Sequence, residues 1–170
     1  MKNKLFNIPP IPAVLFAIIS VQSGAAIAKT LFPAIGAAGT ASLRIGISAI
    51  ILLAVYRPNL LKITPNQWKI VIPYGLSLGA MNLIFYLAIE RIPIGLAVTL
   101  EFIGPLVVAV IGSKRLIDYL WVLLAAIGIV LIAPWSNNGI DLLGVLFALL
   151  AGALWAAYIV LGTKVSKIMK

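Results

Sequence analysis

The chain has 170 residues, of which 63% are hydrophobic and 10% are charged, and its formal net charge is +9. Soluble domains average about 45–50% apolar and about 25% charged residues, so this composition excludes an ordinary water-soluble domain and indicates an integral membrane protein. The sequence has no Cys and no His, which excludes disulfides, thiolate catalysis and imidazole-based acid–base chemistry.

Six apolar stretches reach or approach the length that a bilayer requires, about 20 helical residues. In chain order they cover residues 11–28, 38–56, 70–89, 94–112, 117–133 and 142–162. Prolines and turn-forming residues separate them, and the connections are short, so consecutive spans must run in opposite directions. We therefore predict an all-α membrane protein with six transmembrane helices.

The first stretch also resembles a secretory signal peptide. Lys2 and Lys4 precede an apolar segment, and residues 26–28 read A-I-A, which is typical of a cleavage site. However, the polar triplet Q-S-G at 22–24 interrupts the apolar run, and five more spans follow. We favour an uncleaved first helix.

The basic residues fall mainly on one side of the predicted spans. With the N-terminus in the cytoplasm, ten of the 13 Lys and Arg residues lie inside, two lie outside, and Arg44 lies within a span. The positive-inside rule then places both termini in the cytoplasm. This distribution argues against a nucleic-acid partner, because the basic side chains would contact the headgroups of the lipid bilayer. The inner set is Lys2, Lys4, Arg57, Lys62, Lys69, Lys114, Arg115, Lys164, Lys167 and Lys170, and the outer set is Lys29 and Arg91.

A short sequence from the first span recurs in the sixth. The letters V-L-F-A occupy residues 14–17 and again residues 145–148. The first span runs outward and the sixth inward, so a five-helix unit followed by its copy would give the inverted repeats of many secondary transporters. We predict one five-helix repeat over residues 1–136 and the first helix of a truncated second repeat over residues 137–170.

Five stretches resemble a known transporter family. They read SVQSGAAIAKTLFP (20–33), YGLSLGAMNLIFYLAI (74–89), PIGLAVTLEFIGPL (93–106), WVLLAAIG (121–128) and GALWAAYIVLG (152–162). They are similar, in the same order, to the threonine/homoserine exporters of the drug/metabolite transporter superfamily, which carry EamA-type repeats. The resemblance implies an inner-membrane permease with two inverted five-helix repeats. This chain has six predicted spans, where the family has about ten.

The resemblance implies a secondary exporter of small amino acids such as threonine and homoserine, working by alternating access and coupled to protons. Two alternatives remain open. One is a permease for another metabolite or drug. The other is a truncated or half-size membrane protein without independent transport, which would act as a homodimer or with a complementary half. No catalytic constellation is present, so we expect no enzyme, no metal and no cofactor.

Two of the predicted spans contain a charge well inside their ends, Arg44 in the second and Glu101 in the fourth. A charge at the centre of a transmembrane helix costs roughly 2.5–3.5 kcal/mol on insertion scales and is by default a functional candidate. At about 1.5 Å per residue, both charges lie about 9–10 Å below the outer end of their spans. Equal depth and opposite sign predict an ion pair. The pair would either join two helices or face the substrate pathway, where Glu101 would bind an ammonium group or take up a proton.

Pro105 follows Glu101 by four residues, with Gly104 beside it. Proline removes the hydrogen bond to the carbonyl of residue 101 and clashes with that carbonyl, so we predict a helix kink at Gly104 and Pro105. The freed carbonyl would then line a cavity. The alternative is a packing kink without a ligand role.

Polar and aromatic side chains in three other spans complete the candidate substrate pathway. They are Gln22 and Ser23 in the first span, Asn82 and Tyr86 in the third, and Trp155 and Tyr158 in the sixth. Such groups suit a pocket for an amino acid. For Gln22 and Asn82 the alternative is hydrogen bonding between helices, worth about 0.6 kcal/mol on average.

Gly75 and Gly79 form a G-x-x-x-G pattern in the third span. Small residues at this spacing allow two transmembrane helices to approach closely. We therefore predict close helix packing at this pair.

Overall fold

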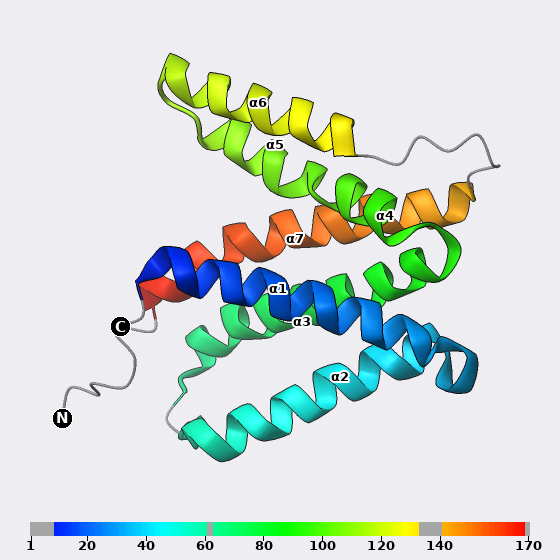
Figure 1. The fold of residues 1–170 in the computed structure, drawn as a ribbon. Helices are drawn as coiled ribbons and strands as arrows, with labels where there is room; N and C mark the ends of the chain where they lie inside the picture. The colour runs from blue at the N-terminus through cyan, green and yellow to red at the C-terminus, as the bar shows by residue number, and fades with distance from the viewer. Residues whose placement is uncertain (1–8, 61–62, 133–140, 169–170) are drawn as a thin grey trace.

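The computed structural model describes residues 9–60, 63–132 and 141–168. These residues form seven helical segments: α1 (Pro10–Thr30), α2 (Phe32–Tyr56), α3 (Pro65–Arg91), α4 (Ile94–Glu101), α5 (Ile103–Gly112), α6 (Leu116–Ile132) and α7 (Leu142–Ile168). Since α4 and α5 are two parts of one span, there are six membrane helices (Figure 1). Five spans are long and apolar enough to cross a membrane, and α6 is a shorter apolar helix. The predicted all-α, six-helix architecture is confirmed.

The centre of the bundle is the pair α3 and α7, which lie side by side and make the most extensive contact between helices (Figure 1). Alanines on α7 allow this approach, because Ala148 and Ala151 are fully buried. On α3, Tyr86 and Ile89 are the largest side chains that are fully buried. The segments α4 and α5 cross α7, α6 packs against α5, and α2 packs against α3. The buried core that supports the site therefore consists of residues from α1 to α4 and from α7.

The helix α1 is the least embedded of the long helices. Among its described side chains only Ala25 and Ala28 are buried, and its packing partner is mainly α2. The two helices are joined at Leu31, and α2 bends at Gly36, whose φ of +70° favours glycine. The Thr40 hydroxyl donates to the Gly36 carbonyl at 2.8 Å, which satisfies that acceptor at the bend. The regular part of α2 after the bend matches the predicted second span.

The fourth span is interrupted at Phe102, between α4 and α5. The interruption lies three residues before Pro105, which cannot donate a backbone hydrogen bond to the Glu101 carbonyl. That carbonyl faces α7, because a Cβ added at Gly152 would lie 2.6 Å from the Glu101 oxygen. The oxygen therefore packs against the backbone of α7, whereas the sequence predicted it in a cavity wall.

The close helix crossing uses different glycines from the predicted pair. A Cβ added at Gly104 would overlap the backbone carbonyl of Gly152, so α5 and α7 meet backbone to backbone. In contrast, nothing lies within 4 Å of a Cβ added at Gly75 or Gly79. The prediction of close packing at Gly75 and Gly79 is wrong for the described part of the chain.

The α3–α7 pair is fastened at the C-terminal end of α3 and again near the middle of α3. At one end, Arg91 Nη1 donates to Asp141 Oδ2 at 3.0 Å. Further along, the hydroxyl of Tyr74 donates to that of Tyr158 at 2.8 Å, and their rings stack with centroids 4.6 Å apart. These contacts hold α7 against the preceding five-helix segment.

Replacing Asp141 by Asn is expected to lower the melting temperature slightly at pH 7 and by less at about pH 3. The hydrogen bond from Arg91 is the main reason that the pKa of Asp141 lies below its usual value. A depressed carboxyl pKa stabilises the fold above the unfolded value, about 3.9, and this stabilisation is lost as the pH falls through the folded value. Asn can still accept the backbone N–H bonds that Asp141 receives from Leu143 and Gly144.

The measurement for Asp141→Asn is a thermal melt of the purified protein in detergent at both pH values. Lys164→Gln, which changes an exposed charge elsewhere on the chain, serves as the control. An Asp141→Asn deficit of equal size at both pH values would contradict the role of the ion pair.

The path of the chain brings the start of α1 and the end of α7 to the same end of the bundle (Figure 1). The predicted repeat boundary between residues 136 and 137 lies outside the described residues, as do the basic residues Lys2, Lys4, Lys62 and Lys170. The division into one repeat plus one helix stays a prediction.

Candidate functional site

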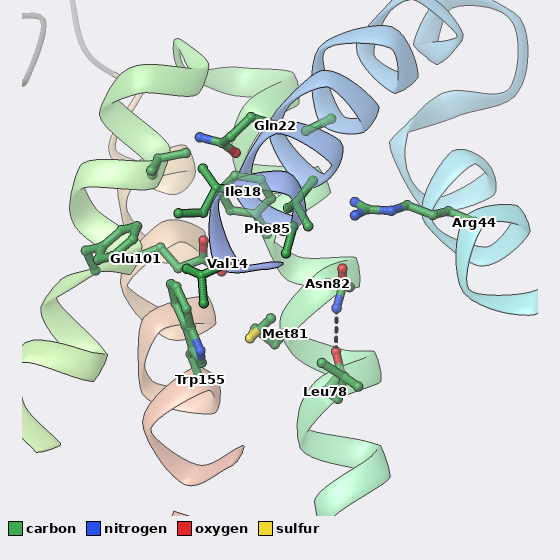
Figure 2. Close-up of a pocket in the computed structure, with 15 residues that line it drawn as sticks. Val14, Ile18, Gln22, Arg44, Leu78, Met81, Asn82, Phe85, Glu101 and Trp155 are labelled. Carbon is green, nitrogen blue, oxygen red and sulfur yellow. Dashed lines mark hydrogen bonds between the residues drawn. The ribbon is translucent and has the colours of Figure 1, made fainter. Parts of the chain in front are cut away.

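A cavity of about 540 Å³ lies among α1, α2, α3, α4 and α7 (Figure 2). Cavities of about 300–1,000 Å³ with apolar walls and a few polar groups are typical of small-molecule sites. The lining residues are Val14, Ala17, Ile18, Val21, Gln22, Ala25, Arg44, Leu78, Met81, Asn82, Phe85, Val98, Glu101, Phe102 and Trp155. The cavity is thus built by helices that are distant in sequence.

Glu101 lines this cavity as the last residue of α4. The residue is only 7% exposed, and within the described parts of the chain its carboxylate forms no ion pair. Burying an ionised carboxylate without a partner is costly. A ligand cation or a proton at this position would reduce that cost.

Arg44 lines the same cavity from α2. Its Nη1 donates to the Tyr86 hydroxyl at 2.9 Å, and its guanidinium carbon lies 5.7 Å from the centroid of the Tyr86 ring. Figure 2 shows the guanidinium directed toward the cavity from the side opposite Glu101. The predicted ion pair between Arg44 and Glu101 is wrong: across the described residues the one ion pair is Arg91 with Asp141. Equal depth did not bring the two charges into contact, because Tyr86 binds Arg44.

The structure brings five of the eight sequence-predicted pathway residues to the cavity: Gln22, Arg44, Asn82, Glu101 and Trp155. Part of the hydrogen-bonding capacity of Asn82 is used locally, because its Nδ2 donates to the Leu78 carbonyl at 2.9 Å (Figure 2).

The other three predicted residues lie outside the lining. Ser23 is exposed on α1, on a different face from Gln22. Tyr86 is fully buried beneath Arg44. Tyr158 is paired with Tyr74 on the α3–α7 contact. All three are close in sequence to residues that line the cavity, but their side chains lie outside its lining.

Apart from Trp155, the apolar wall of the cavity was missed by the sequence reasoning. Phe102 and Trp155 form an edge-to-face pair with ring centroids 5.0 Å apart and an interplanar angle of 70°, which is a favourable aromatic geometry. On α1 and α3, lining residues recur at helical spacing, as at Val14 and Ile18. Counting back from Gln22 and Asn82 in steps of one helical turn could have predicted these apolar residues from the sequence.

The cavity therefore combines apolar walls with one anionic and one cationic side chain. In the portion of the chain that the structure describes, no group of His, Cys, Asp and Glu could hold a metal ion. The arrangement suits reversible binding of a small polar molecule.

Comparison with known proteins gives two informative relatives. The chain is 45% identical over 157 residues to threonine/homoserine exporter RhtA of Salmonella typhimurium (strain SL1344), and the match covers 91% of this chain and 53% of that protein. It is 44% identical, with the same coverage, to threonine/homoserine exporter RhtA of Escherichia coli (strain K12). The chain spans about half the length of the curated relatives it matches. No protein-family model matches the chain, and no solved structure matches it.

Proposed function

We propose that this chain, which is a homologue of the EamA-type threonine/homoserine exporters, exports small amino acids such as threonine and homoserine across the bacterial inner membrane. The observation that carries the proposal is the 45% identity, which extends over 91% of the chain. The five long apolar helices and the cavity between them support it, because a transporter needs a binding site at membrane depth.

The proposed orientation has both termini in the cytoplasm. Basic residues support it, because Arg57 directly follows α2, Lys114 lies between α5 and α6, and Lys164 lies near the end of α7. Figure 1 shows these ends of α2, α5 and α7 at the same end of the bundle, and cytoplasmic loops carry an excess of basic residues. The proposed mechanism is alternating access between inverted repeats, with protons as the coupling ion. Glu101 supports proton coupling because it is a buried carboxylate that lines the cavity.

The alternative is a membrane protein that does not transport by itself. It is favoured by the coverage of the relatives, because about half of each relative has no counterpart in the match. On this alternative, a second copy of the chain or a complementary half would supply the missing helices.

The test is export of labelled threonine from preloaded cells that express the chain alone, compared with cells carrying an empty vector. We expect efflux at least several-fold above the vector control. A second strain also expresses the remaining part of the Escherichia coli relative. Efflux only in that second strain would favour the half-size alternative, and no efflux in either strain would overturn the proposed function.

A further inference from the structure

The cavity keeps two opposite charges on separate walls. Arg44 reaches it from α2 and Glu101 from α4, and Figure 2 shows them on opposite sides with apolar side chains such as Ile18 and Phe85 between. Opposite charges attract strongly where water is scarce. A structure that holds them apart must restrain at least one of them.

The restraint on Arg44 is Tyr86. The Tyr86 ring is fully buried and packs against Phe32 and Phe85, with ring centroids 5.8 and 6.5 Å away. Because the ring is fixed, its hydroxyl fixes the guanidinium through the 2.9 Å hydrogen bond. A guanidinium has five N–H donors, so donors remain for a ligand in the cavity.

Glu101 is restrained by the backbone. It lies where α4 ends, and its carbonyl packs against Gly152 of α7. Its carboxylate is buried without an ion-pair partner among the described residues. The cavity thus offers a carboxylate on a fixed backbone opposite a guanidinium held by Tyr86.

From this geometry we propose that the cavity recognises the zwitterionic form of an α-amino acid, with its carboxylate on Arg44 and its ammonium group on Glu101, and that Tyr86 is the positioning residue for Arg44. Guanidinium groups bind carboxylates through paired N–H donors. The aromatic pair Phe102 and Trp155 forms the wall beside Glu101, where the rest of a small ligand would pack. This inference rests on the proposed function, whose substrate class it explains.

The experiment measures binding of labelled threonine to the purified chain in lipid nanodiscs by scintillation proximity. Two unlabelled competitors are threoninamide, which lacks the carboxylate, and 2,3-dihydroxybutyrate, which has a hydroxyl in place of the amino group. We expect each competitor to bind at least 10-fold more weakly than threonine. Equal binding of threonine and either competitor, or no binding of threonine, would overturn the proposal.

The variant Tyr86→Phe keeps the buried ring and removes the hydroxyl. We expect it to weaken threonine binding about 5- to 10-fold and to narrow the preference for threonine over threoninamide, while the preference over 2,3-dihydroxybutyrate stays unchanged. The matched control Tyr74→Phe removes the other tyrosine hydroxyl that is bonded on α3, and both preferences should stay unchanged. A Tyr86→Phe variant that elutes as folded protein with unchanged preferences would overturn the positioning role.

Failure of the inference and failure of the proposed function give different results. A chain that binds threonine with these preferences but does not export it leaves the recognition geometry intact and removes autonomous export. A chain that exports threonine but binds threoninamide equally well keeps the proposed function and removes the charge-based recognition.

Discussion

Replacing Glu101 by Gln is expected to reduce threonine export at least 10-fold and, at the same time, to raise the thermal stability of the protein. The carboxylate is buried and has no ion-pair partner among the described residues, so neutralising it removes an uncompensated charge. The cost of such a group is roughly 1–3 kcal/mol or more. Gln has nearly the same shape and preserves packing, whereas it loses the charge to which the proposed function assigns the binding of an ammonium group or a proton.

The measurement combines cellular export with a melting curve of the purified protein in detergent. The control is Glu90→Gln, which neutralises an exposed glutamate at the end of α3 and should change neither quantity. A Glu101→Gln variant that melts at a lower temperature and still exports at the original rate would give Glu101 a structural role. Opposite signs for stability and activity are therefore the signature of a functional carboxylate.

The six-helix fold could be predicted from sequence because it depends on long apolar runs, which require no knowledge of partners. The bend at Gly36 could not, because many glycines are compatible with a regular helix, and a positive φ is imposed by the chain around the residue. The interruption at Phe102 could be predicted approximately, because Pro105 lies only three residues after it.

For the candidate site, too, part of the arrangement could be predicted from the sequence and part could not. Depth along a span can be counted from the sequence, and the two charges predicted at equal depth both line one cavity. The sequence does not show which neighbouring helix a side chain faces, because this depends on how the helices pack against one another. In the structure the Arg44 side chain faces α3, where it binds Tyr86 rather than Glu101. A prediction from depth alone therefore identified the two charges but did not predict that Arg44 binds Tyr86.

Which glycines allow two helices to pack closely also depends on the neighbouring helix, which the sequence does not show. The pattern at Gly75 and Gly79 has a recognised spacing, yet both positions open onto free space among the described residues. The closest crossing instead uses single glycines, Gly104 on α5 and Gly152 on α7, which are 48 residues apart in sequence. Such a pair carries no local signal.

Replacing Gly104 by Ala is expected to have the largest effect on folding of any single-methyl change in the bundle. The added Cβ would overlap the backbone carbonyl of Gly152, and a helix backbone cannot yield as a flexible side chain can. Overpacking of this kind costs typically 1–3 kcal/mol and occasionally more. Separation of α5 from α7 would also displace Glu101, since its carbonyl packs on Gly152, so threonine binding should fall together with stability.

The matched control is Gly79→Ala, because a methyl group there meets nothing within 4 Å. Helix propensity favours Ala over Gly by about 1 kcal/mol, so this variant should be as stable as the original chain or slightly more stable. Size-exclusion elution and melting temperature in detergent measure both variants. If Gly104→Ala eluted and melted like Gly79→Ala, then α5 and α7 could not meet backbone to backbone. In that case the position of Glu101 would require another support, because the Gly152 contact is what holds the Glu101 carbonyl against α7.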